Sequence, residues 1–331
     1  MDLVTLVVTL RCAQGRLLLS HGCPIQAVVA AFGFDERTVA DWQARAGLHC
    51  EQVHGHLVEQ GQVDVQHVQA DELWVKLVGK RVWQAMAMAV PSRLWLGGVI
   101  SEHRDGVLIQ SLVEKVRACA VSLAIPSLRS GQALVCVDGL ASYVTAFLRV
   151  FRNPVYTGKR GRPRLVVEQG LLLGQVVKQY AQHRVVSVKR RVVRGTPEAI
   201  AGGLEATGTG HDINTAYIER LNATFRSCLA PLVRRGRAIA HKEAVLRAAM
   251  CLVGCAYNFC WYHDSLRLSA PEGASRKWQE RTPAMAAGLT DHRWTMLELL
   301  SYQVPLPAWV APKRRGRPPK QAQQPTMVSA A

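Results

Sequence analysis

Three acidic residues in this chain have the type and surroundings that metal-dependent phosphodiester chemistry requires. Asp71 opens a strand-like run, Asp138 directly follows a short apolar run, and Glu219 lies in a stretch rich in Arg and Asn. Phosphodiester transfer places an attacking oxygen in line with a leaving oxygen, and a pair of divalent ions can activate the first and neutralise the second. Carboxylates are natural ligands of Mg²⁺, for which Mn²⁺ can substitute, so we predict that Asp71, Asp138 and Glu219 are catalytic and bind two such ions.

The neighbours of these acids limit which side chains can meet. Asp71 and Glu72 must face opposite sides of a strand, so only one of them can point at the metal ions, and we expect it to be Asp71. Helical spacing places a set of polar side chains on one face: Thr215, Glu219, Asn222 and Arg226. We expect Asn222 and Arg226 to flank the Glu219 carboxylate and contact DNA phosphates.

The alternative interpretation is that the three acids are unrelated. Asp138 would then be a turn residue before Gly139, Asp71 a charge at a strand edge, and Glu219 half of a surface pair with Arg220, because most acids in a sequence are solvated surface groups. Their joint placement favours a shared site. A carboxylate directly after an apolar strand occupies the position where catalytic groups of mixed sheets tend to lie, and a basic segment precedes Glu219.

The composition points to a folded protein that binds a polyanion. The chain has 331 residues, about half of them apolar, with 41 Lys and Arg against 24 Asp and Glu, a formal charge of +17. Nucleic acid is the polyanion that a soluble chain this basic most often binds. A ribosomal protein or a basic membrane-surface protein would share the charge, but neither is expected to combine it with a large apolar core and spaced single acids.

The cysteines indicate neither a disulfide framework nor a zinc knuckle. There are nine, an odd number, and no CxxC pair. Cys251, Cys255 and Cys260 with His263 are an alternative metal site, but they lie in an apolar run typical of a helix with buried thiols. We expect neither a signal peptide nor a membrane span, and predict a cytoplasmic, nucleoid-associated protein.

Residues 1–60 predict a small helical unit with helix-turn-helix spacing. One helix runs from Pro24 to Phe32, a turn covers Gly33 to Asp35, and a second helix runs from Glu36 to Ala46 with Asp35 as its N-cap. The exposed face of the second helix would present DNA-binding side chains to a major groove: Arg37, Thr38 and Arg45. The alternative is an ordinary helical hairpin with Trp42 in its core.

Residues 65–265 predict an α/β catalytic domain of the ribonuclease H-like type. The periodicity predicts the following elements in order: strands at Ala70–Val78, Val82–Val90 and Leu94–Ile100, a helix from Asp105 to Ala120, a strand at Ala133–Val137, a helix at Ser142–Phe151 and a further strand at Pro154–Tyr156. This succession matches a mixed sheet in which the first strand is central and the fourth lies parallel beside it.

The remaining segments are predicted to be a basic insertion, two helices and a C-terminal region. Residues 159–212 read as an irregular insertion that contacts DNA backbone. A helix from Asn214 carries Glu219, and an apolar helix at Lys242–Tyr262 packs behind it. Residues 266–310 are predicted as a helical extension and residues 311–331 as a disordered basic tail.

Two short segments resemble AT-hook cores. Lys159-Arg160-Gly161-Arg162-Pro163 lies inside the insertion and Arg315-Gly316-Arg317-Pro318 in the tail. Arg-Gly-Arg-Pro can lie extended in a narrow minor groove, where glycine permits close approach and arginine meets the negative potential. The alternatives are a basic loop that contacts phosphates for the first segment and a solvated tail for the second. The predicted DNA contacts are Lys159, Arg160, Arg162, Arg315 and Arg317.

Several of these strings resemble the catalytic blocks of bacterial insertion-sequence transposases of the DDE class, and the insertion-sequence-one group is the closest in pattern. The strings are Asp71-Glu72-Leu73-Trp74, Val137-Asp138-Gly139 with Tyr143, and Asn214 to Asn222 around Glu219. The run from Arg226 to Arg237, with Arg234 and Arg235 as further DNA contacts, continues the likeness, which covers roughly residues 65–265. Transposases of that group often begin with a cysteine-rich zinc finger, and no CxxC is present here.

The resemblance implies a ribonuclease H-like domain, dependence on Mg²⁺, and action as a homodimer or higher multimer on paired element ends. Double-stranded DNA, both the terminal inverted repeats and the target, is the implied partner. Water would cleave at the element end, and the freed 3′-OH would attack target DNA. Two alternatives remain open at this stage: a non-catalytic DNA-binding regulator, and a structure-specific nuclease on the same fold.

Overall fold

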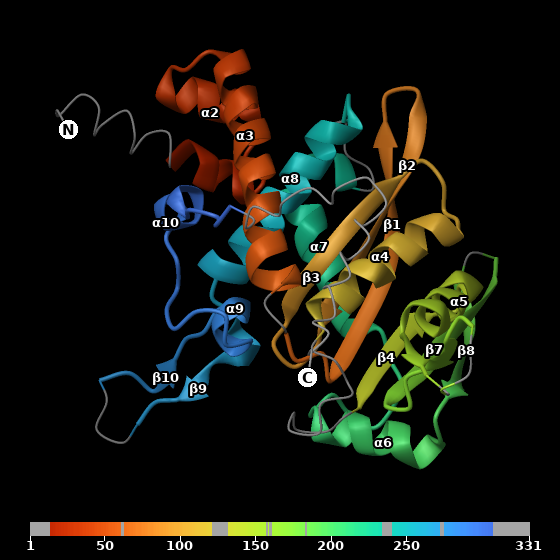
Figure 1. Ribbon diagram of the computed structural model, residues 1–331. Coiled ribbons are helices and arrows are strands. Elements are labelled where there is room, and N and C mark those ends of the chain that lie inside the picture. The colour runs from red at the N-terminus through yellow and green to blue at the C-terminus, as the bar shows by residue number, and fades with distance from the viewer. Residues whose placement is uncertain are drawn as a thin grey trace, which may run out of the picture.

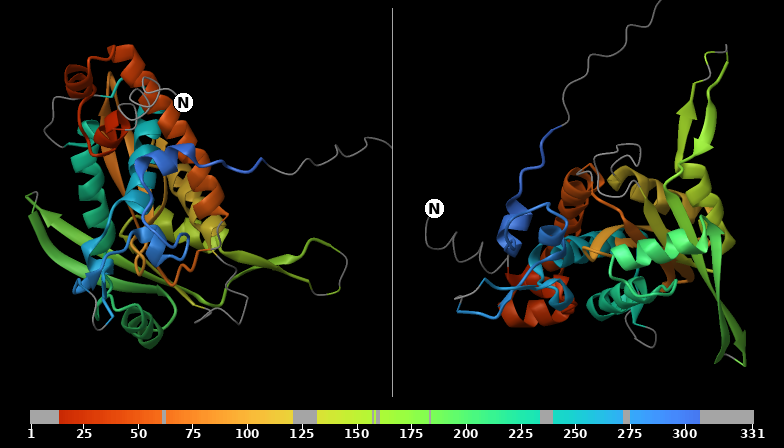
Figure 2. Two further views of the ribbon diagram at one scale, coloured as in Figure 1. Left: turned by 90° about the vertical axis from the view of Figure 1, so that its left-hand side faces the viewer. Right: turned by 90° about the horizontal axis from the view of Figure 1, so that it is seen from below.

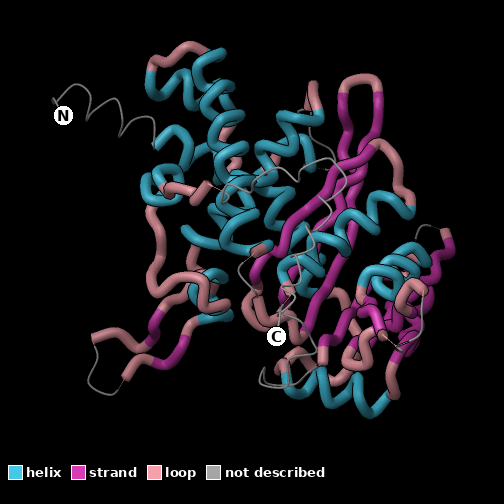
Figure 3. The backbone as a smooth tube through the Cα atoms, in the orientation of Figure 1, coloured by secondary structure: helices cyan, strands magenta, loops and turns pink. Residues whose placement is uncertain are grey.

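The computed structural model describes residues 14–60, 63–120, 132–156, 158, 161–182, 184–233, 240–271 and 275–306. Its centre is a mixed sheet with helices on both faces (Figures 1 and 3). The sheet has six strands: β1 (His67–Leu77), β2 (Lys80–Ala89), β3 (Leu94–Ser101), β4 (Ala133–Asp138), β7 (Leu171–Ala181) and β8 (Arg184–Arg194). The prediction of a mixed α/β domain is therefore confirmed.

The strand order is β3-β2-β1-β4-β7-β8. β1 pairs antiparallel with β2 and parallel with β4, β4 pairs parallel with β7, and β8 closes the edge antiparallel to β7. β4 is buried on both faces from Ala133 to Val137, as its unbroken apolar sequence predicts. The first strand is central and the fourth lies parallel beside it, an order compatible with a ribonuclease H-like fold.

Two helical layers enclose the sheet. α4 (Gly106–Cys119) and α5 (Ala141–Val150) pack on one face, while α7 (Ala216–Cys228) and α8 (Glu243–Cys255) pack on the other, where a π-helical turn at Ala256–Cys260 extends α8. α6 (Pro197–Ala206) covers β4 and β7 through a smaller apolar cluster that includes Leu134, Leu172 and Leu204. Asp105 caps α4 by accepting hydrogen bonds from Val107 N and Leu108 N, as its position predicts.

The N-terminal helices have the predicted spacing but a different end. After a helical segment at residues 14–20, α2 (Ile25–Phe32) ends at Gly33, and Asp35 caps α3 by accepting from Arg37 N and Thr38 N. α3 does not stop at Ala46 but runs to His54 and continues as a π-helical turn, Gly55–Glu59. Gly47 lies inside α3, at the point where α3 crosses α8. A glycine is needed there because a Cβ would meet the Ala248 carbonyl oxygen at 2.3 Å.

The prediction of an irregular insertion at residues 159–212 is wrong for the part of the segment that the structure describes. It contains β6 (Arg164–Val167), β7, β8 and α6. The strand expected at Pro154–Tyr156 is β5 (Arg152–Val155), which pairs with β6 in a separate ribbon, and β7 is the fifth strand of the main sheet. Figure 2 shows the β5–β6 and β7–β8 ribbons extending from the body in opposite directions. β6 and most of β8 are solvated, whereas β7 is buried from Leu171 to Leu173 and at Val176.

The C-terminal extension is only partly helical. A 3-10 turn (Asp264–Leu266) is followed by a small ribbon of β9 (Leu268–Ser269) and β10 (Trp278–Gln279), then by the short helices α9 (Pro283–Ala286) and α10 (Met296–Ser301). The predicted tail, residues 311–331, lies outside the described residues. One helical stretch, Glu243–Leu266, is long and apolar enough to cross a membrane, but 78% of its window is buried in the fold, as is typical of a core helix.

The cysteines of the apolar helix are buried thiols, as predicted. Cys251, Cys255 and Cys260 are free and buried, and burial raises the pKa of Cys251 and of Cys260 to about 12. Among the described residues, the group of side chains close enough to hold a metal ion is Asp71, Glu72 and Asp138, and it includes none of these cysteines. The alternative metal site with His263 therefore has no support among the described residues.

Candidate active site

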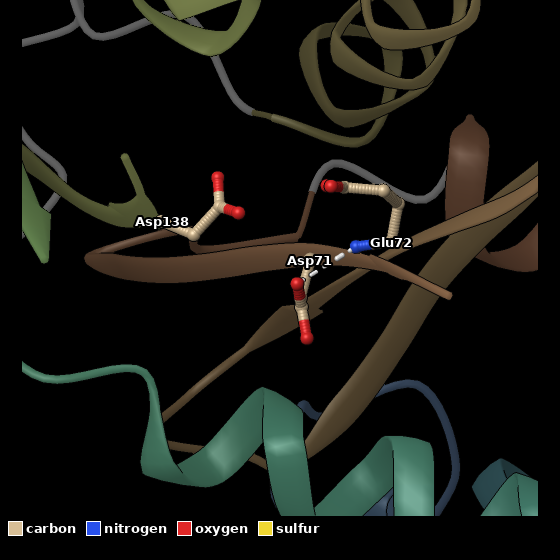
Figure 4. A group of neighbouring side chains, drawn as sticks. All are labelled: Asp71, Glu72 and Asp138. Carbon is tan, nitrogen blue, oxygen red and sulfur yellow. Dashed lines mark hydrogen bonds between the residues drawn. The ribbon is translucent and has the colours of Figure 1, made fainter. Parts of the chain in front are cut away.

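Asp71 and Asp138 come together because β1 and β4 are parallel neighbours. Gln69 pairs with Cys136 and Ala70 with Val137, so the next position places Asp71 beside Asp138 at the end of β4. Carboxylate oxygens of Asp71, Glu72 and Asp138 all lie within 4.8 Å of one another (Figure 4). Two members of the predicted trio thus share one site, although many residues separate them in the chain.

The carboxylate of Asp71 is directed toward α7 and is held at both oxygens (Figure 4). Asn222 Nδ2 donates to Oδ2 at 2.8 Å, and the backbone N–H of Glu72 donates to Oδ1 at 2.9 Å. The pKa of Asp71 is raised to about 7. Burial is the main cause, the negative charges of Glu72 and Asp138 add to it, and the hydrogen bond from the Glu72 N–H partly opposes it. The group is therefore poised between its neutral and charged forms near neutral pH.

Glu72 lies on the opposite side of β1 from Asp71, as the strand period requires, and has its own partners. Its side chain is only 1% exposed. Arg104 donates to Glu72 Oε1 through Nε at 2.7 Å and also through Nη2, and the Tyr143 hydroxyl donates to Oε2 at 2.9 Å. A carboxylate that is buried and paired in this way is positioned to hold Arg104 in place. Glu72 also belongs to the group of three carboxylates that could hold a cation, so the choice of Asp71 over Glu72 as the metal ligand stays a prediction.

Asp138 carries a second carboxyl group with a raised pKa. Burial is the main cause, the charge of Glu72 adds to it, and Arg104 and Lys178 partly oppose it. Arg104 Nη2 lies 3.6 Å from Asp138 Oδ2, and the N–H of Leu140 donates to Oδ1 at 3.0 Å. Arg104 therefore lies between Glu72 and Asp138 and orients both of them.

Glu219 is on α7, as predicted, but its carboxylate is not among the clustered oxygens. Its Oε1 accepts from Lys178 Nζ at 2.5 Å and from the Thr215 hydroxyl at 2.9 Å. The charge of Glu219 still contributes to the raised pKa of Asp71, after burial and the other acids. Its side chain is 47% exposed. The structure thus brings two of the predicted acids together and leaves the third on the adjacent helix, paired with Lys178.

Gln69 fixes α7 to the central strand. Its side chain is fully buried, and Oε1 accepts from the backbone N–H groups of Tyr217 and Ile218 at 3.0 and 3.1 Å. Nε2 donates to the Asn214 carbonyl oxygen at 2.9 Å. The first N–H groups of a helix have no partner within the helix, so Gln69 caps α7 from β1. This contact sets where Glu219 and Asn222 lie relative to Asp71.

The donor set fits a hard divalent cation. All the converging ligand atoms are carboxylate oxygens, which suit Mg²⁺ and Mn²⁺ and do not select for soft metals. The raised pKa values of Asp71 and Asp138 arise from burial and from their crowding with other negative charges. A bound cation would relieve that repulsion. Asp71 and Asp138 would hold it, and Glu219 would reach a second ion only by exchanging Lys178 for metal.

The predicted DNA-contacting residues fall into three groups. Arg37, Thr38 and Arg45 are exposed on α3, where Arg45 pairs with Asp41 at 2.8 Å, and Arg162 is exposed before β6. Asn222 is buried, 1% exposed, and donates to Asp71, so it does not lie on the exposed face predicted for it, whereas Arg226 is half-buried. The others lie outside the described residues: Lys159, Arg160, Arg234, Arg235, Arg315 and Arg317.

Three residues of the site were not predicted, namely Gln69, Arg104 and Lys178. Gln69 had a readable signal, because it precedes Asp71 by two residues and therefore shares its face of an otherwise apolar strand. Lys178 follows an apolar run that was assigned to the irregular insertion. Arg104 lies in a loop after β3, and nothing in the local sequence shows that this loop folds back onto Glu72.

The comparisons with known proteins do not identify the chain. No protein-family model matches it, and a search of curated proteins finds no match.

Proposed function

We propose that this protein is a DNA transposase of the DDE class, with a ribonuclease H-like catalytic domain and a requirement for Mg²⁺ or Mn²⁺. The observation that carries the proposal is the meeting of Asp71 and Asp138 on adjacent parallel strands, beside a helix that bears Glu219. The strand order and the formal charge of +17 support the same assignment. Chemistry at this site is phosphodiester cleavage at element ends followed by strand transfer.

The residues around the carboxylates have separate tasks in this mechanism. Asp71 and Asp138 bind the cation, Asn222 keeps the Asp71 carboxylate turned toward α7, and Arg104 orients Asp138. Gln69 holds α7 so that Glu219 stays within reach. Bound divalent ions would activate the attacking oxygen and neutralise the leaving one.

The other assignments follow from the same reading. α2 and α3 form a helix-turn-helix unit that contacts element ends through Arg37, Thr38 and Arg45. Arg162, the basic ribbons and the C-terminal tail contact DNA backbone and minor groove. The protein acts as a homodimer or higher multimer, in the cytoplasm at the nucleoid.

The test supplies purified protein with Mg²⁺ or Mn²⁺ and a plasmid that carries the gene with its native flanking DNA. The matched variants are Asp71→Asn, Asp138→Asn and Glu219→Gln, which keep side-chain size and remove charge. We expect each to abolish cleavage and joining while binding of duplex DNA persists. A variant that keeps full activity removes its residue from the site. Cleavage without joined products would identify a nuclease, and unchanged behaviour of all three would leave a DNA-binding regulator.

A second readout is independent of activity. Ligands that bind only the folded state raise its stability by mass action, by about 2.7 kcal/mol at a hundredfold excess over the dissociation constant. Mg²⁺ and Mn²⁺ should therefore raise the Tm of the native protein and fail to do so for Asp138→Asn. An equal rise in both proteins would show that the cation binds elsewhere.

A further inference from the structure

A cleft of about 520 Å³ lies on the other side of α7 from the acidic cluster. Its walls come from α7, from the turn after β2 and from the segment that follows α8. Three arginines and four aromatic side chains supply most of its chemistry: Arg93, Arg220, Arg267, Tyr217, Tyr257, Trp261 and Tyr262. A cavity of this size is in the range that encloses a small organic ligand.

The arginines of the cleft have no carboxylate partner within the described part of the chain. No ion pair involves Arg93, Arg220 or Arg267, although Asp264 is also part of the lining. Arg93 and Arg220 both line the cleft, and the charges of both lower the pKa of His263, after the larger effect of burial. Arg93 donates to the Val90 carbonyl oxygen and, at 3.4 Å, to Ser265 Oγ, which fixes its guanidinium group in the cleft. Guanidinium groups without a carboxylate partner, gathered in a concave site, are suited to bind a phosphate.

The backbone and side chain of Arg93 are fixed by two tyrosines that line the cleft. Arg93 has a left-handed backbone, φ 57°, which is uncommon for a residue with a side chain. The Tyr257 hydroxyl donates to the carbonyl oxygen of Arg93 at 3.1 Å, and the guanidinium group of Arg93 lies 4.0 Å from the centre of the Tyr217 ring. Strained backbone persists where the surroundings impose it, and such positions cluster at ligand sites.

A second cavity continues the first. It encloses about 300 Å³ and shares four residues with the first, namely Tyr262, His263, Asp264 and Arg267. It adds Trp278, two basic residues, Arg276 and Lys277, and one acid, Glu280. Arg267 lies 4.6 Å from the centre of the Trp278 ring. Aromatic faces alternating with basic groups along a groove are the pattern with which proteins bind unpaired nucleic acid strands, because every base has a face that can stack.

We propose that this groove binds unpaired nucleotides of a DNA strand, with a base against the ring of Tyr262 and a phosphate between Arg220 and Arg267. The choice of DNA as the polymer rests on the proposed function. The new inference is that the protein holds a DNA strand whose bases are unstacked. Bases inside a duplex have no free face to offer these rings. Arg220 follows Glu219 directly on α7, so the groove would hold such nucleotides across α7 from the acidic cluster.

The test measures the affinity of the full chain, without added metal, for a labelled oligothymidylate and for a hairpin duplex. The double variant Arg220→Gln, Arg267→Gln is compared with Arg149→Gln, which removes an exposed positive charge from α5, away from the groove lining. We expect the double variant to weaken single-strand binding about tenfold more than duplex binding. If the two DNA forms weaken equally, the arginines are a general basic surface and the proposal fails.

The role of the base is tested with a second pair of variants and an abasic oligonucleotide. Tyr262→Ala should weaken binding of the oligothymidylate about tenfold, because it removes a stacking face. It should leave binding of the abasic strand unchanged, and Tyr262→Phe should restore normal affinity. Equal weakening for both strands would overturn base stacking. The native protein separates the two proposals: normal groove binding with no metal-dependent cleavage by the native protein would reject the transposase and keep the groove. Asp71→Asn should lose cleavage and keep groove binding, and a loss of groove binding in this variant would show that the groove is not a separate site.

Discussion

At the scale of single residues, the charged form of the Asp71 carboxyl group destabilises the folded protein. Its pKa is raised from 3.8 to about 7, first by burial and then by Glu72 and Asp138. A raised pKa for an acid means that the folded state disfavours the charged form, so the penalty is absent below pH 4, grows between pH 4 and 7 and is constant above pH 7. We expect Asp71→Asn to stabilise the metal-free protein at pH 8, by on the order of 3 kcal/mol.

The measurement is urea unfolding of the native protein and of Asp71→Asn at several pH values, in chelator. The gain in stability should shrink as the pH falls from 7 toward 4, because the native carboxyl group is then protonated as well. Asp64→Asn is the control, since Asp64 is exposed and should show little effect at any pH. A difference between native protein and Asp71→Asn that does not depend on pH would contradict the raised pKa.

Gln69 gives a second prediction at this scale. Replacement by Leu keeps most of the volume but leaves Tyr217 N–H, Ile218 N–H and the Asn214 carbonyl oxygen without their partner. An unsatisfied buried group costs about 1–3 kcal/mol. Only Ile218 is fully buried, while Tyr217 and Asn214 are half-buried and can be reached by water, so we expect Gln69→Leu to lower the free energy of unfolding by roughly 2–4 kcal/mol. Cleavage should be lost as well, because α7 is no longer fixed.

The control for Gln69 is Gln66→Leu, since Gln66 is half-buried and its side chain bonds to Asp64. Wild-type stability and activity in Gln69→Leu would show that other contacts position α7.

How far the sequence predicts the site depends on how local each contact is. Asp71 and Asp138 could be paired in advance because alternation and strand order follow from short stretches of sequence. The Arg104–Glu72 pair and the Lys178–Glu219 pair could not, because each depends on where a loop or a distant strand lies in three dimensions. Asn222 was placed on the correct face of α7, but nothing local showed that this face is covered by β1.

At the scale of elements, the crossing of α3 and α8 depends on a glycine. A Cβ at Gly47 would lie 2.3 Å from the Ala248 carbonyl oxygen and 2.4 Å from its Cα, which are backbone atoms that cannot move aside by rotation. We therefore expect Gly47→Ala to lower the free energy of unfolding by about 1–3 kcal/mol, the range for overpacked cores. The measurement is chemical denaturation followed by circular dichroism.

The chain offers a matched control for this prediction. Gly55 also lies in the helical region, and a Cβ there would meet nothing within 4 Å. Gly55→Ala should be neutral or slightly stabilising, because alanine has the higher helix propensity. Equal destabilisation by both substitutions would mean that the loss in free energy of unfolding comes from the alanine in the helix itself and not from the crossing of α3 and α8.

The elements that the sequence predicted well are those with one buried face. β1 to β4, α4, α7 and α8 have the apolar periodicity of half-buried or buried elements, and their predicted positions agree with the structure to within a few residues. β8 was missed because its basic residues were read as a loop, and β7 was missed because its apolar run was assigned to the same insertion. An edge strand that is largely solvated, such as β8, can carry charge on either face, so hydrophobic alternation is a poor guide to it.

At the scale of the whole molecule, positive charge is carried outward on the projecting ribbons. β8 is the edge strand of the main sheet and contains five basic residues among its eleven, together with the exposed Val185, Val186 and Val188. Two physical explanations are available. The charges contact DNA phosphates, or they keep an exposed strand edge from pairing with other copies.

The double variant Arg184→Gln, Lys189→Gln separates these explanations, because both residues are exposed and neither forms an ion pair with another described residue. Each phosphate contact contributes about 0.9 to the slope of log affinity against log salt concentration on duplex DNA. If both residues contact phosphate, we expect the slope to fall by about 1.8 with no change in light scattering. If they protect the edge, the slope should stay constant and the variant should aggregate. The slope is measured by fluorescence anisotropy across a salt series, with Arg149→Gln as the single-charge reference.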